Sequence, residues 1–173
     1  EEVLFLTEDC AQLYVADHGE SAVVRVCGRA NFVSSVPFKK LINGLMGRGC
    51  GKFTLDLSNC YLMDSTFIGV LVGLSRKFEK SYESILLFGP SEQVQAMFDN
   101  LGVLGLFGLV NTLCEEDNFD PIASAGDVVD KSELTNNSIE AHKTLMGVSR
   151  ENELKFKEVA RFLEENLEVK SQD

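Results

Sequence analysis

Short apolar runs alternate with longer segments of helical periodicity through residues 12–113, and this alternation limits the folds open to the chain. Around His18-Gly19, apolar and β-branched residues predict a hairpin of two strands over 12–28. The predicted helices cover 34–49, 65–81 and 91–103, and the predicted strands that separate and follow them cover 52–60, 84–89 and 108–114. The order ββαβαβαβ indicates an α/β fold, with a small mixed β-sheet flanked by α-helices.

Serines stand where the predicted helices begin. Ser35 and Ser91 are candidate N-caps. The helix predicted over 65–81 begins at about Ser65, so the simplest interpretation of the Ser65 hydroxyl is also that of an N-cap. In this last helix, Gly69 and Gly73 are four residues apart, which predicts a groove that a strand can approach closely. Apolar residues nearly all round the helix predict that it is buried, with its first turn at the surface.

The chain is acidic, and its charge is unevenly distributed. Its 16 basic and 27 acidic residues give a net charge of -11, of which -3 falls on residues 1–114 and -8 on residues 115–173. No basic run is interleaved with aromatic residues, so direct nucleic-acid binding is disfavoured. The step in charge predicts a domain boundary near residue 114.

The acidic tail divides into a linker and a helix. Residues 115–138 are polar and contain a proline, which is typical of a linker. Residues 139–173 have the periodicity of an amphipathic helical extension, with Gly147 as a possible break. Its apolar stripe can fold back on the domain or pair with another chain, and we expect self-association into a homo-oligomer to be slightly favoured. We expect the stripe to bury Phe156, Val159, Leu163 and Leu167.

Five cysteines form no C-x-x-C pair and do not cluster with a histidine, so neither a disulfide framework nor a zinc site is indicated. Reduced thiols fit a cytoplasmic protein. The longest apolar stretches are too short to span a membrane, and no targeting signal is visible, although a start at Glu1 instead of Met suggests that the native N-terminus is missing. We expect no metal, no cofactor and no membrane insertion.

The stretch "DLSNCYLMDSTFIGVLVGL", residues 56–74, resembles the signature of the STAS family of anti-sigma factor antagonists. The common form of that signature is Asp-Leu-Ser, a gap, and then Met-Asp-Ser-Ser-Gly-Leu-Gly-Val-Leu, and the order of elements over 12–113 is also similar. The resemblance implies that Ser65, directly after Met63-Asp64, is phosphorylated by a partner that is both a serine kinase and an anti-sigma factor. It also implies a serine phosphatase that resets the switch.

Two departures from the signature bear on the partner. Phe67 stands where the family often has glycine, in a first turn that we expect to be exposed, and Asn31 stands where the family often has an acid near the phosphorylation site. The implied docking surface contains Asp64, Ser65, Thr66, Phe67 and Asn31. Phosphorylation would add about -1.5 to -2 charge beside Asp64 and release the partner.

Other functions stay open on the residues alone. A serine nucleophile needs a base, but His18 in a hairpin turn and His142 in the tail do not look placed to serve, so we expect no catalytic residues and no enzyme activity. The segment 44–52, "GLMGRGCGK", departs from the phosphate-loop pattern. A scaffold in which Ser65 is never phosphorylated, or a regulatory subunit of a signalling assembly or transporter, are the alternatives.

Overall fold

The computed structural model of the chain describes residues 10–113, 118–122 and 130–172. Within these residues a mixed sheet has the strand order β6-β5-β3-β2-β1-β7, and β4 pairs with the far end of β2. This is the α/β architecture that the sequence predicts. The strands are β1 Gln12–Asp17, β2 Ser21–Ala30, β3 Lys52–Asp56, β4 Cys60–Met63, β5 Ile85–Phe88, β6 Gly108–Val110 and β7 Asp120–Pro121.

The predicted hairpin is confirmed, and the rest of the sheet is built from parallel neighbours. β1 and β2 pair antiparallel, with Gly19 at a φ of 82° in the turn between them, where a side chain would be strained. β2, β3, β5 and β6 run parallel to one another. Two short strands, β4 and β7, were not predicted, and β7 lies in the segment predicted to be a linker.

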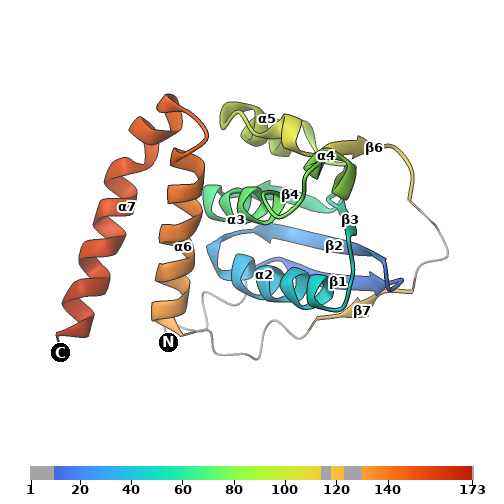
Figure 1. Cartoon of the computed structure of the whole chain (residues 1–173), viewed down its shortest axis with the longest axis horizontal. Helices are drawn as coiled ribbons and strands as arrows, with labels where there is room; N and C mark the ends of the chain where they lie inside the picture. The colour runs from blue at the N-terminus through green and yellow to red at the C-terminus, as the bar shows by residue number, and fades with distance from the viewer. Residues whose placement is uncertain (1–9, 114–117, 123–129, 173) are drawn as a thin grey trace.

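Helices cover the sheet, and a pair of C-terminal helices stands beside it (Figure 1). Asn31 caps α2, the first helix in the chain that the structure describes, through its side chain, so the prediction of Ser35 as the cap is wrong. Ser91 caps α5 as predicted. The helices are α2 Phe32–Gly47, α3 Ser65–Ser75, α4 Ser81–Ser84, α5 Glu92–Asn100, α6 Lys131–Met146 and α7 Arg150–Ser171, with a 3-10 turn, η1, at Leu104–Leu106.

The core lies between the sheet and the helices α2, α3 and α5. α3 is buried along almost its whole length, as its apolar composition predicts. Phe67 of α3 packs on Phe38 of α2 with ring centroids 4.7 Å apart, and both side chains are fully buried. From the sheet, Phe53, Leu55 and Leu87 complete the core beneath them.

The C-terminal segment is a pair of adjacent helices, and α6 packs on the face of α3 (Figure 1). α6 begins at Lys131, inside the segment predicted to be a linker over 115–138, and the predicted break at Gly147 separates it from α7. The tail therefore packs on its own domain. Phe156 is buried as expected, Leu163 and Leu167 are half-buried, and Val159 is 42% exposed, so its predicted burial is wrong.

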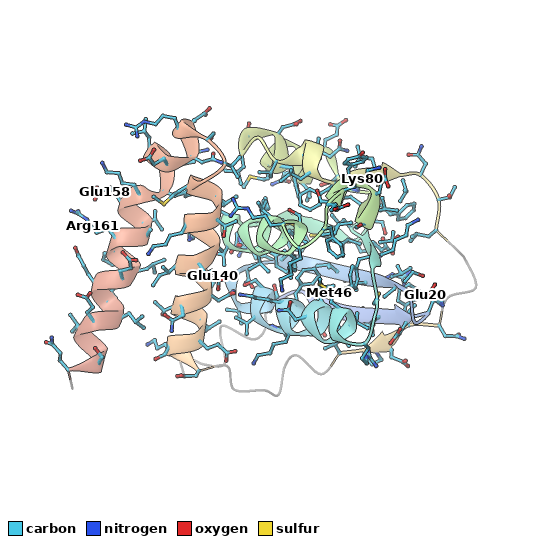
Figure 2. All side chains as sticks on the ribbon, in the orientation of Figure 1. Glu20, Met46, Lys80, Glu140, Glu158 and Arg161 are labelled. Carbon is cyan, nitrogen blue, oxygen red and sulfur yellow. The ribbon has the colours of Figure 1, made fainter. Side chains whose placement is uncertain are left out.

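The outer side of α7 is charged as well as partly apolar. Glu158 and Arg161 project from it, away from α6, and form an ion pair of 2.6 Å (Figure 2). Among the described residues no helix is long and apolar enough to cross a membrane.

Candidate functional site

Asp64 joins the N-termini of two helices. As the N-cap of α3, its Oδ1 accepts a hydrogen bond from the Phe67 backbone N–H at 2.8 Å, and its Oδ2 accepts one from the Phe32 N–H of α2 at 2.7 Å. Burial raises the pKa of Asp64, against the opposing effect of these two hydrogen bonds. The carboxylate thus stabilises two helix N-termini, where partial positive charge accumulates.

Ser65 is the first residue of α3 and follows the cap. The interpretation of Ser65 as a helix cap is therefore wrong, because Asp64 fills that role. Ser65 is partly exposed, and its Oγ lies 3.0 Å from Nε2 of His142 on α6. The hydroxyl is thus held between the start of α3 and a histidine from the C-terminal tail.

Thr66 and Phe67 do not lie on an exposed surface. Thr66 is 4% exposed and its Oγ1 contacts Ser138 Oγ at 3.1 Å, while Phe67 is fully buried against Phe38. The expectation of an exposed first turn with Phe67 in the docking surface is wrong, because α6 and α2 cover that turn. Because the signature has glycine at that position, it does not predict where the aromatic ring of Phe67 lies.

On the neighbouring helix, Asn31 is half-exposed and caps α2 by accepting hydrogen bonds from the Val33 and Ser34 backbone N–H groups. The next residue, Phe32, is 38% exposed and donates its N–H to Asp64. An exposed aromatic residue, Phe32, is therefore joined through its backbone to the Asp64 carboxylate that precedes Ser65, and sequence reasoning did not select it.

His142 is placed where a base for Ser65 would be, contrary to the expectation that neither histidine could serve. Its side chain is 5% exposed, and its Nδ1 lies 2.7 Å from the Ser138 carbonyl oxygen. Burial lowers its pKa, although the Ser138 carbonyl and the negative charge of Asp64 act in the opposite direction. A neutral ring whose Nδ1–H donates to the carbonyl leaves Nε2 free to accept from Ser65.

Polar contacts fasten α6 to α2 and α3 around this pair. The Asn137 side-chain amide donates to Ser35 Oγ at 2.9 Å, and Lys39 pairs with Glu140 at 2.9 Å on the side of α6 that faces the domain (Figure 2). Gly69 of α3 lets α6 approach closely at Ala141. The groove predicted at this glycine therefore receives a helix and not a strand. Asn137 and Ala141, a polar and a small residue four positions apart on α6, are the sequence signal for the packing of α6 on α2 and α3.

A hollow of about 370 Å³ opens beside Ser65. Its walls are largely apolar, and the exposed Lys155 of α7 lies at its rim. No group of acidic, cysteine or histidine side chains suited to a metal ion occurs among the described residues, and the four cysteines that they include are free thiols. The lining residues are Leu62, Met63, Asp64, Ser65, Met97, Asn100, Leu101, Lys155 and Phe156.

Comparisons with solved structures identify the fold. The anti-sigma factor antagonist SpoIIAA in its unphosphorylated form is 22% identical, with a TM-score of 0.51 over 62% of this chain and 91% of that one. An anti-sigma factor antagonist from Mycobacterium paratuberculosis is also 22% identical, with a TM-score of 0.53 over 61% of this chain and 89% of that one. No protein of curated function shows significant sequence similarity to the chain.

The family model described as "Mlab, STAS domain" matches residues 13–111, which run from β1 past β6 and include Asp64 and Ser65. The helices α6 and α7, and with them His142, lie outside the match. On this evidence the chain belongs to the STAS domain family.

Proposed function

We propose that the chain is an anti-sigma factor antagonist that acts as a serine phosphorylation switch at Ser65. The observation that carries the proposal is the position of Ser65, partly exposed beside an open hollow at the start of α3. The neighbouring hydroxyls are less suitable acceptors, because Thr66 is buried and the Ser58 hydroxyl donates to Asp56 at 2.6 Å. The solved anti-sigma factor antagonists with this fold support the assignment of function.

The switch acts through charge. A phosphoryl group on Ser65 brings about -1.5 to -2 charge next to the Asp64 carboxylate, which also accepts a hydrogen bond from the backbone N–H of Phe32. The phosphate then repels an acidic partner surface that docks over Asn31, Phe32 and Ser65. An apolar partner surface is disfavoured there because docking removes water from the phosphate. Thr66 and Phe67 are buried and lie outside this surface, and their packing holds the first turn of α3 in place.

The partners are an anti-sigma factor that is also a serine kinase, and a serine phosphatase that restores the hydroxyl. The unphosphorylated chain binds the anti-sigma factor and the phosphorylated chain releases it. Free thiols among the described cysteines agree with a cytoplasmic location for this cycle. No chemistry by the chain on other molecules is required.

Phosphate mapping tests the acceptor. The full chain, a Ser65→Ala variant and a Thr66→Val variant are incubated with the cognate kinase and ATP, and the modified peptides are identified by mass spectrometry. We expect one phosphate on Ser65 in the wild type and in Thr66→Val, and none in Ser65→Ala. Phosphate on Thr66 or Ser58, with Ser65 unmodified, contradicts the assignment.

A second candidate is a constitutive scaffold, or a regulatory subunit of a signalling assembly or transporter, in which Ser65 is never phosphorylated. The observation that favours it is that α6 already covers the face of α3 next to Ser65. In either case the exposed apolar residues of α7 provide a surface for a homo-oligomer. The phosphorylation state of Ser65 in the native cell separates the two candidates.

A further inference from the structure

The Ser65–His142 contact has the geometry of a nucleophile and its base. Ser65 Oγ and His142 Nε2 are 3.0 Å apart, within the range in which a histidine removes a proton from a hydroxyl. The two residues come from different parts of the chain, α3 within the family match and α6 beyond it. The tail therefore adds a proton acceptor to a serine that the domain presents.

The imidazole is oriented by its other nitrogen. Nδ1 lies 2.7 Å from the Ser138 carbonyl oxygen, so its proton points along α6 and the lone pair of Nε2 faces Ser65. The Phe156 ring packs against the imidazole with centroids 5.2 Å apart. An orienting hydrogen bond on the base is the third part of a nucleophilic site.

Charges near the pair suit the transfer of a proton. Burial keeps His142 neutral at pH 7, in the form that accepts a proton. The Asp64 carboxylate lies close enough to stabilise the imidazolium once the proton has moved. The start of α3 adds partial positive charge beside the oxygen that becomes the nucleophile.

An electrophile has room to approach Ser65 from the hollow. Lys155, an exposed cation, is among the residues that line this hollow, where its charge favours an anionic phosphoryl donor. Apolar walls from Leu62, Met97 and Phe156 limit the water around the reacting atoms.

From these observations we infer that Ser65 is an activated nucleophile toward electrophilic phosphorus and that His142 is its general base. The bond from Ser65 Oγ to phosphorus forms, the bond from phosphorus to the leaving group breaks, and the leaving group takes that electron pair while the Oγ proton moves to His142 Nε2. With ATP as donor the leaving group is ADP, and this case rests on the proposed function. The chain thus brings the base for its own phosphorylation.

An organophosphorus fluoride tests the pair without a kinase or a partner. The full chain is incubated with a biotinylated fluorophosphonate, whose leaving group is fluoride, and the labelled residue and the rate are measured by mass spectrometry. We expect Ser65 to be labelled, Ser65→Ala to lose the label, and His142→Gln to react at least about 100-fold more slowly. No label on Ser65, or equal rates in the wild type and His142→Gln, overturns the inference.

A pH–rate profile of the wild type tests the pair without any substitution that alters the docking of α6. The labelling rate should fall as the pH is lowered through the pKa of His142, which lies below 6.5, and level off above it. A profile that stays flat from pH 8 down to the lowest pH at which the chain remains folded overturns the inference even if Ser65 is labelled. Because no kinase is present, either failure leaves the phosphate-mapping result of the proposed function to stand or fall separately.

Discussion

The backbone of Ala141 on α6 lies so close to Gly69 on α3 that a methyl group at position 69 would come within 2.5 Å of the Ala141 carbonyl oxygen. Four residues along the same helix, the position of a methyl group on Gly73 is 4.0 Å from its nearest neighbour, Thr144 Oγ1. The two glycines therefore differ in their distance from α6, and this difference makes them a matched pair for experiments on the tail.

Gly69→Ala should displace α6 from α3, whereas Gly73→Ala should not. Both changes improve the helix propensity of α3 by up to about 1 kcal/mol, but only the first forces two backbones apart, at a cost of about 1–3 kcal/mol. Hydrogen exchange of the α6 amides on the full chain measures the difference. Equal protection of α6 in the two variants would show that the close approach does not limit docking.

Ser65→Asp should weaken binding of the anti-sigma factor by at least about tenfold, or 1.4 kcal/mol, and Ser65→Ala should retain it. Only the first variant adds charge next to Asp64. Ser171→Asp adds the same charge to the exposed end of α7, far along the chain from the docking surface, and serves as the control. Calorimetry at matched salt gives the affinities, and similar values for Ser65→Asp and Ser65→Ala would contradict the charge switch.

Folding stability should fall as the solution becomes acidic below pH 6.5. Burial lowers the pKa of His142 from 6.5, so the unfolded chain takes up the proton first, and stability is lost as the pH falls through the folded pKa. Each unit of pKa difference corresponds to about 1.4 kcal/mol. Urea unfolding at a series of pH values measures this.

His142→Gln is the control for that pH dependence. Glutamine retains a polar side chain but does not titrate, so the stability of this variant should depend less on pH below 6.5. The raised pKa of Asp64 acts in the opposite direction at lower pH, nearer its ordinary value of 3.8. An identical slope in the two proteins would show that His142 does not carry the effect.

The full chain should self-associate through α7, and Phe162→Glu should abolish the association. Phe162 is 62% exposed and Val169 is 64% exposed on a helix whose opposite side packs on α6. A Ser171→Glu variant adds the same charge at the end of the helix and should leave the oligomer intact. Sedimentation velocity distinguishes these cases, and a monomeric wild type at high concentration would rule out the oligomer.

Local patterns in the sequence predicted the parts of the fold that local chemistry determines. The hairpin turn uses the positive φ of Gly19 and the start of α5 uses the side chain of Ser91, and α6 ends at the glycine, Gly147, that the pattern marked as a break. The Asp56-Leu57-Ser58 run is local only in part: Asp56 accepts hydrogen bonds from the Ser58 backbone N–H and hydroxyl, but it also accepts one from Arg25 Nε on β2 at 2.8 Å.

Contacts between distant segments were not predictable in this way. Ser65 and His142 are 77 residues apart, and no periodicity in either segment specifies that they meet. The burial of Phe67 depends on Phe38 of another helix, and the early start of α6 depends on its packing on α2 and α3. Tertiary packing decided these features, and it outweighed the composition of the polar segment before Ile139.

β7 shortens the tether of the tail. Because residues 120–121 pair with β1 at the sheet edge, the segment that connects α6 to the domain is counted from Pro121 instead of from β6. A short connection keeps α6 at an effective concentration of about millimolar or more near α3. Even a weak contact between the two helices is then enough to keep His142 beside Ser65 most of the time. The pairing of two β7 residues with β1 thereby raises the fraction of time that Ser65 has His142 as its neighbour.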